Sequence, residues 1–127
     1  MAKGNVEDFY PLSPMQQGML FHSMLEPESG VYVEQWACTL KGQFDLPAFT
    51  KAWQHVMGRH AILRTGFLGE SQQGPVQVVY RKVPLEVDQK DWRKQTEMEQ
   101  AEALADWLAA DRQRGFDLKR PPLMRER

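Results

Sequence analysis

Two arginines and a histidine stand inside an apolar run in the stretch RHAILRTGF, residues 59–67. Arginine keeps its charge in proteins, so Arg59 and Arg64 each need either water or an anionic partner. Two interpretations stay open: helix-end arginines that reach solvent, or a buried ion pair with a carboxylate. No acid lies within the stretch, where position 61 is Ala61. A carboxylate partner would therefore have to come from elsewhere.

The three histidines, His22, His55 and His60, are the next candidates for acid–base or metal chemistry. His55 and His60 are five residues apart, which does not place them on one face of a helix, so the spacing disfavours a metal site. His60 falls on the apolar face of an expected helix, and His22 falls near the end of another. Both positions favour a structural histidine over a catalytic base.

The single cysteine, Cys38, lies inside an expected strand with no basic cluster or helix start nearby to activate it. We interpret it as a small core residue rather than a nucleophile. The sequence contains no GxSxG nucleophile elbow, and neither GxGxxG nor GxxxxGK is present. Nucleophilic serine chemistry and nucleotide binding therefore have no motif support.

The first of the elements that must position these residues is a helix that begins after Ser13. In SPMQ, Ser13 and Gln16 form a capping box with Pro14 at the first helical position, and we expect the helix to end before Pro27. Gly18 in its interior costs about 1 kcal/mol, which suggests close approach by another group. Its apolar residues face more than one side, so it should be well buried, and methionines of this kind fill core gaps or line adaptable binding surfaces; they are Met15, Met19, Leu20, Met24 and Leu25.

The rest of the chain alternates strand and helix signals. Asp45 can cap a helix with Pro47 in its first turn, and that helix has an apolar face that ends at His60. Gly115 supplies a stop for the longest helix, whose buried stripe runs from Met98 to Leu108. The remaining elements are a strand over 31–42, a hairpin of RTGFL and PVQVVY, a short strand over 84–88, the long helix over 91–115 and an extended segment over 116–123.

Composition is that of an ordinary globular domain. Of 127 residues, 42% are hydrophobic and 26% are charged, and 16 basic against 17 acidic residues give a net charge of −1. No basic block predicts nucleic acid or membrane binding. One cysteine excludes an internal disulfide and fits a reducing compartment. The first residues lack the apolar core of a signal peptide, so we expect a cytoplasmic location.

Two long stretches resemble a known family. YPLSPMQQGMLFHS (10–23) and RHAILRTGF (59–67) closely resemble the first two signature motifs of condensation domains of nonribosomal peptide synthetases. GVYVEQ and FDLKRPPLMR (116–125) also look like the matching segments of that family. The resemblance runs over nearly the whole chain, in the right order.

The resemblance implies an α+β fold like that of chloramphenicol acetyltransferase, in which a mixed sheet packs with helices. The chain would be a partial condensation domain, most of its N-terminal lobe, over residues 1–127. Members of the family join an acyl or peptidyl donor to an aminoacyl acceptor through an amide bond. Both substrates arrive on phosphopantetheine arms of carrier domains, so no directly bound cofactor is expected. The partners would be the upstream and downstream carrier domains and the rest of the domain.

The resemblance also assigns roles to residues. Arg59 and Arg64 resemble arginines that organise the site, and at least one would pair with an acid beyond residue 127. Helix residues on the acceptor side of the tunnel would be Ser13, Met15, Gln16, Gly18, Met19 and His22. The family's HHxxxDG motif does not occur in the sequence, so no catalytic residue is expected here and the chain alone should be inactive.

Two other functions stay open. A non-catalytic, carrier-docking domain of the same fold, or an epimerisation, cyclisation or acyltransferase relative, would share the same motifs. FDLKRPPLMRER should lead into a central strand, and without it the sheet of residues 31–42 and 76–88 presents an open edge. Open edges recruit other strands, so we expect self-association or pairing with another chain.

Overall fold

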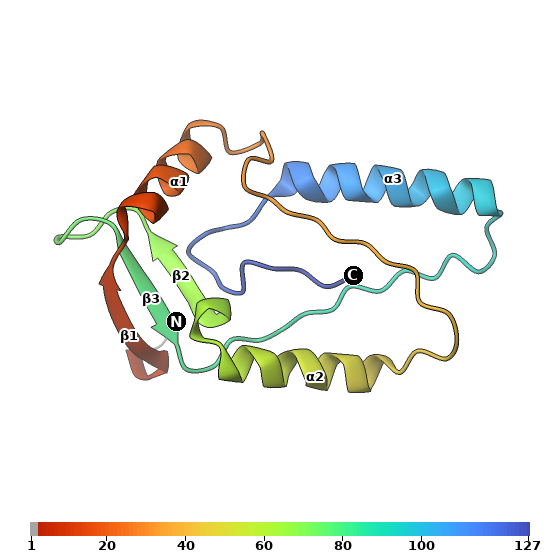
Figure 1. Cartoon of the computed structure of the whole chain (residues 1–127), viewed down its shortest axis with the longest axis horizontal. Helices are drawn as coiled ribbons and strands as arrows, with labels where there is room; N and C mark the ends of the chain where they lie inside the picture. Colours follow the sequence, from red (N-terminus) through yellow and green to blue (C-terminus); the bar gives the residue numbers. More distant parts are fainter. Residues whose placement is uncertain (1–2) are drawn as a thin grey trace.

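The computed structural model describes residues 3–127 and places helices around a small sheet (Figure 1). The order is strand, helix, helix, hairpin, helix, which differs from the predicted order because the strands expected over residues 31–42 and 84–88 do not form. The elements are β1 (Val6–Pro11), α1 (Pro14–Leu25), α2 (Leu46–Arg59), β2 (Thr65–Leu68), β3 (Val76–Tyr80) and α3 (Glu97–Arg114), with short 3-10 helices at Lys3–Asn5 and Ala61–Arg64.

β3 lies between β1 and β2 and pairs antiparallel with both. The predicted hairpin of RTGFL and PVQVVY is confirmed, since β2 and β3 pair from Thr65 opposite Val79 to Leu68 opposite Val76. β1 is a strand that the sequence analysis missed. Its stretch VEDFYP carries two acids and a proline, and it becomes a strand through its partner β3 rather than through propensity.

The helix starts follow local chemistry. Ser13 caps α1 and forms the predicted capping box with Gln16, and Asp45 caps α2. A second capping box, between Thr96 and Glu99, starts α3 later than predicted. Gly115 ends α3 as expected. Capping boxes satisfy backbone N–H groups within three residues, which explains why such boundaries can be predicted from sequence.

The strand predicted over residues 31–42 does not form. The segment is irregular and mostly exposed, and within the described residues no hydrogen bond reaches the backbone of residues 34–42. Cys38, expected in the core of that strand, is exposed for the same reason. The predicted strand over 84–88 reduces to one parallel bridge between Val87 and Glu126. Strand propensity yields a strand only where a neighbouring strand supplies hydrogen-bonding partners.

The expected burial of the helices is also wrong. Neither α1 nor α3 contains a fully buried residue, and Met15 and Met98 are 77% and 73% exposed. His60, expected on the buried face of its helix, is exposed at the end of α2. The apolar core is therefore small and lies on and around β3; it consists of Leu12, Met57, Val76, Val78, Val79 and Leu85.

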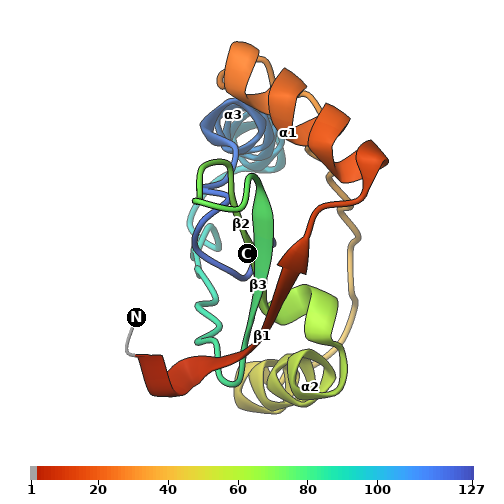
Figure 2. The same cartoon turned by 90° about the vertical axis from the view of Figure 1, so that its left-hand side faces the viewer.

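The arrangement is open. α1 and α3 lie along one edge of the molecule and α2 lies along the opposite edge, and the sheet stands at the left of Figure 1, between α1 and α2. The segment between α1 and α2 runs along one side of the molecule from the first edge to the second (Figure 2). Among residues 3–127, no helix is both long and apolar enough to cross a membrane.

The backbone of the C-terminal segment lies directly against β2 at Gly66. The Phe67 N–H donates to the carbonyl of Leu118 at 2.7 Å, and a Cβ at position 66 would lie 2.8 Å from the carbonyl oxygen of Lys119. A methyl group at position 66 would therefore have to displace the backbone of Lys119. Gly66 therefore permits the close approach that joins the C-terminal segment to the sheet.

We predict that Gly66→Ala lowers the free energy of unfolding by about 1–3 kcal/mol, as overpacking does elsewhere. The matched control is Gly18→Ala. Nothing lies within 4 Å of a Cβ at position 18, which corrects the expected close approach, so alanine should stabilise α1 by about 0.5–1 kcal/mol. Urea melts at one protein concentration measure both. Equal shifts of the same sign for the two variants would contradict the role of Gly66.

Candidate functional site

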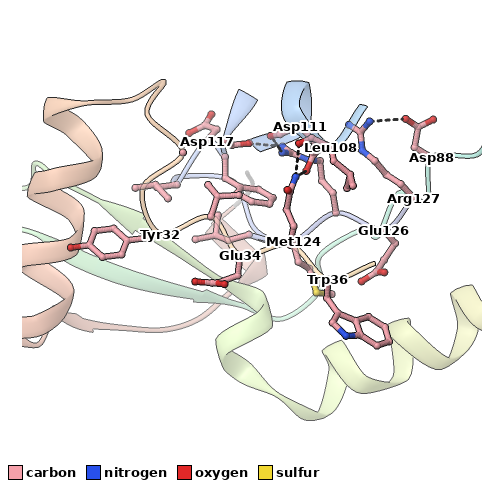
Figure 3. A pocket seen from close by; sticks show the side chains of 18 of the residues that line it. Tyr32, Glu34, Trp36, Asp88, Leu108, Asp111, Asp117, Met124, Glu126 and Arg127 are labelled. Carbon is pink, nitrogen blue, oxygen red and sulfur yellow. Dashed lines mark hydrogen bonds and ion pairs between the residues drawn. The ribbon is translucent and has the colours of Figure 1, made fainter. Parts of the chain in front are cut away.

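The main concave feature is a hollow of about 1650 Å³. This exceeds the roughly 300–1,000 Å³ of an ordinary small-molecule pocket, so its size suits a larger occupant than a single small ligand. Its walls come from both edges of the molecule, the one that holds α1 and α3 and the one that holds α2. Figure 3 shows part of these walls. They include residues of α1, the extended segment 30–40, α2, the end of β2, residues 87–92, α3 and the C-terminal segment 115–127.

Only part of the predicted tunnel helix faces this hollow. Gln16 and Met19 line it. Gln16 also reaches β3, because the Gln77 side chain donates from Nε2 to Gln16 Oε1 at 3.0 Å. Gln77 is buried, so this amide pair fixes the start of α1 against the sheet. The other predicted helix residues are not among the lining residues; these are Ser13, Met15, Gly18 and His22.

His22 and the methionines of α1 lie at the surface. His22 Nδ1 lies 2.9 Å from the hydroxyl oxygen of Tyr32, and the two rings stack with centroids 6.2 Å apart. Tyr32 lines the hollow and His22 does not. His22 is therefore connected to the hollow only through its contact with Tyr32. Met15 and Met24 are 77% and 61% exposed. Of the two interpretations of the Met-rich helix, this exposure favours an adaptable binding surface over core packing.

Arg64 is buried and has its partners inside the chain. Its Nε donates to the Met57 carbonyl at 2.9 Å, and its Nη1 donates to the Tyr80 carbonyl at 2.5 Å. Nη1 also lies 3.2 Å from the Glu7 carboxylate. The guanidinium therefore ties α2, β3 and β1 together. Glu7 is the acid that the sequence analysis did not identify, and it stands on the strand that the analysis missed.

Arg59 differs from Arg64 in its surroundings. It is exposed at the last position of α2, and it is not among the residues that line the hollow. A cation in the last turn of a helix interacts favourably with the negative end of the helix dipole. The solvent-exposed interpretation holds for Arg59 within the described residues, whereas the buried ion pair holds for Arg64.

A second charged cluster, which the sequence analysis missed, joins α3 to the C-terminal segment. Arg125 donates from Nε to Asp111 Oδ1 at 2.8 Å and from Nη2 to the Asp111 carbonyl at 3.0 Å. Its Nη1 donates to the carbonyl of Gly115, and its guanidinium lies 4.1 Å from the centroid of the Phe116 ring. Arg125 thus braces the C-terminal end of α3, where the Asp111 carbonyl also accepts from the Gly115 N–H at 3.3 Å.

Asp111 is the centre of this cluster. Besides Arg125, it pairs with Arg127, whose Nε lies 3.3 Å from Asp111 Oδ1 and whose Nη1 lies 3.4 Å from Asp88. Gln35 donates from Nε2 to the Leu108 carbonyl at 2.7 Å, with Asp111 Oδ2 at 3.4 Å. Figure 3 shows Asp111, Arg127 and Asp88 of this cluster along one wall of the hollow. One carboxylate therefore connects the extended segment, α3 and the C-terminal segment.

Two carboxyl groups near this wall have shifted pKa values. Burial raises the pKa of the Glu126 carboxyl above its usual range. Because the folded state holds this proton more tightly, Glu126 carries no penalty below its unfolded pKa, and the free energy of unfolding falls as the pH rises from that value through the folded pKa. Hydrogen bonds from the side chain and backbone of Arg93 lower the pKa of Asp91 to about 2. The Asp91 side chain is 56% exposed, and the interactions that lower its pKa all come from its neighbour Arg93.

Comparison with known proteins identifies the family. The family model of the condensation domain matches residues 6–127 of this sequence. The chain belongs to the condensation-domain family. It is 51% identical over 120 residues to one of the subunits of linear gramicidin synthase from Brevibacillus parabrevis, a match that covers 94% of this chain and 2% of that protein. This condensation-domain chain therefore spans only a small part of the curated relative it matches.

Solved structures agree with this assignment. The starter condensation domain of rhizomide synthetase superposes with a TM-score of 0.67 at 25% identity, over 94% of this chain and 29% of that one. A four-domain nonribosomal peptide synthetase bound to AMP and glycine gives a TM-score of 0.70 at 21% identity, over 92% of this chain and 9% of that one, and so shows the fold alone. The predicted family and the predicted α+β condensation fold are confirmed.

Proposed function

We propose that this chain is the N-terminal-lobe part of a condensation domain in a cytoplasmic nonribosomal peptide synthetase. The observation that carries the proposal is the family match over residues 6–127. In the complete domain, the amine of a carrier-bound aminoacyl acceptor attacks the thioester of a carrier-bound donor. An amide forms, and the donor's thiol leaves on its phosphopantetheine arm.

In this proposal the residues of the chain position the reaction and do not transfer protons. Arg64 supports the site by holding α2, β3 and β1 together through Met57, Tyr80 and Glu7, and Arg59 organises the same region from the surface. The α1 residues Gln16 and Met19 lie on the wall of the hollow. The remaining predicted residues of α1 help to position the reaction from the same helix; they are Ser13, Met15, Gly18 and His22.

A graft tests the proposal directly. Residues 6–127 should replace the matching segment of the linear gramicidin synthase relative that is 51% identical, and the hybrid should form the amide when both loaded carriers are supplied. Mass spectrometry of the carrier-bound product is the measurement. The control is the same exchange with the relative's own segment. A hybrid that folds like this control but yields no product contradicts the proposal.

The 127-residue chain alone is expected to form no amide. The sequence has three histidines at positions 22, 55 and 60 and no HHxxxDG motif, so the histidine that the family resemblance assigns to catalysis is not supplied. Incubation with loaded donor and acceptor carriers should give no more product than a blank without protein. Product above that blank would show that the chain carries a catalytic group of its own.

We also propose that the isolated chain self-associates or pairs with another chain. Its exposed apolar side chains support this, because stable monomers rarely expose large contiguous apolar patches; they include Phe9, Phe21, Trp36, Leu40 and Phe44, all more than half exposed. Light scattering at low micromolar concentration checks the proposal. A monodisperse monomer of 14.7 kDa that melts cooperatively would contradict it.

A further inference from the structure

A buried glutamine on the central strand holds the start of the first motif in place. Gln77 of β3 is only 5% exposed, and its amide is fully used inside the chain. Its Nε2 donates to Gln16 Oε1 at 3.0 Å and to the Pro11 carbonyl at 3.3 Å. Its Oε1 accepts from Gln16 Nε2 at 3.4 Å. These bonds join β3 to the end of β1 and to the first turn of α1, and none involves residues 31–42 or the C-terminal segment.

The same network fixes the direction of the Gln16 amide. Gln16 Oε1 accepts from the Ser13 N–H at 2.9 Å as well as from Gln77, so both of its lone pairs are occupied. A flipped amide would place the NH2 group of Gln16 against these two donors and would break both bonds. The orientation of the Gln16 side chain is thus set by one donor in the cap of its own helix and one donor on β3.

One hydrogen of the Gln16 amide is left for another acceptor. Nε2 carries two hydrogens, and they diverge from a planar nitrogen, so only one can point at Gln77 Oε1. Among residues 3–127 the second hydrogen has no acceptor, while Gln16 is half-buried and lines the hollow. A few polar groups of fixed direction on a concave wall are what orients a bound molecule. This donor is suited to a carbonyl oxygen.

We propose that Gln16 donates this hydrogen to a carbonyl oxygen of a carrier-bound substrate, and that Gln77 is the positioning residue that aims the Gln16 amide. The inference rests on the proposed function and names one of its substrate contacts. Both substrates of that function carry a thioester carbonyl, which is the acceptor that the contact requires. Gln16 binds and orients the substrate, and Gln77 acts only through Gln16.

The test uses the hybrid synthetase described above, because amide formation there gives a KM for each loaded carrier. Gln16→Met removes the donor, and Gln77→Met keeps Gln16 but removes the group that aims it. Methionine has nearly the length of glutamine without its amide. Each variant should raise KM for one loaded carrier about five-fold, as expected for the loss of one neutral hydrogen bond. The double variant should raise that KM no further, because Gln77 acts through Gln16.

A structural role alone predicts a different result. Loss of folded protein lowers the measured rate in proportion but leaves KM unchanged. Val79→Ala is the control, since Val79 is 2% exposed and lies two positions from Gln77 on the same strand. Its truncation destabilises β3 and leaves the Gln16 amide and its partners in place. This control should lower the folded fraction and change neither KM.

The results of these variants decide between the proposals. Equal and non-additive rises in KM support the inference, and the carrier whose KM rises identifies the substrate that Gln16 contacts. An unchanged KM in either single variant, or effects that add in the double variant, overturns the inference and leaves the proposed function standing. An unaltered hybrid that folds but forms no product overturns both. Gln77→Asn is a second variant that keeps an amide but shortens its reach by one methylene, and it should raise the same KM.

Discussion

Arg64→Ala is expected to lower the free energy of unfolding by about 3 kcal/mol. Breaking a buried ion pair costs about 3–5 kcal/mol when the other charge stays buried. Here the side chain of Glu7 is 43% exposed and can regain water, which moves the cost toward the lower end. The carbonyls of Met57 and Tyr80, which Arg64 now satisfies, lose a donor, and each such loss costs about 1–3 kcal/mol where the carbonyl is buried.

Arg59→Ala is the matched control, because it removes the same side chain from the same motif. Arg59 is exposed, so its loss should cost less than about 1 kcal/mol. Urea melts of both variants at one protein concentration give the comparison, since association makes apparent stability depend on concentration. If both variants melt like the parent, the supporting role of Arg64 is wrong. Arg64→Lys should recover only part of the loss, because an ammonium cannot reproduce the fork of the guanidinium.

The two family-like motifs both attach to β3, but at different places. Gln16 of the first motif bonds to Gln77 near the start of β3, and Arg64 of the second bonds to the Tyr80 carbonyl at its end. β3 is the central strand and carries half of the buried apolar core. The polar residues that raised the question of catalysis thus hold the motifs in place. In this chain their chemistry is that of buried hydrogen bonds, which become costly when left unpaired.

Features fixed by near neighbours could be predicted from the sequence. The Ser13–Gln16 capping box, the Asp45 cap and the Gly115 stop each depend on a few consecutive residues, and all three form. The β2–β3 hairpin has its two strands close in sequence and was also predicted correctly. Local hydrogen bonding explains this success, because each signal contains both of its partners.

Features that depend on distant partners could not be predicted. Residues 31–42 have strand composition but find no strand beside them, whereas β1 has poor strand composition and is made a strand by β3. Glu7 is separated from Arg64 by 57 positions, and no spacing rule connects them. Arg125 and Asp111 are 14 positions apart across the end of a helix. Nothing in the sequence marks Asp111, among 17 acidic residues, as the partner of Arg125.

Asp111→Ala is expected to have the largest effect of any single substitution considered, about 3–5 kcal/mol. The side chains of Arg125, Arg127 and Asp111 are only 18%, 19% and 16% exposed. Removing the carboxylate leaves Arg125 without its charged partner and leaves Arg127 with Asp88 alone. Gln35 also loses a contact, although its bond to the Leu108 carbonyl remains. Removing one partner of a buried ion pair is strongly destabilising because the other charge is left uncompensated.

The effect should be local to the C-terminal segment before it becomes global. Trypsin cuts after arginine, so cleavage after Arg125 should become faster in Asp111→Ala, because cleavage requires the segment to leave α3. Asp106→Ala is the control, since Asp106 lies on the same helix and is exposed. It should change neither the melt nor the cleavage rate by more than a small amount. Equal behaviour of the two variants would mean that the cation–π contact of Arg125 with Phe116 and its bonds to backbone carbonyls hold the segment without the carboxylate.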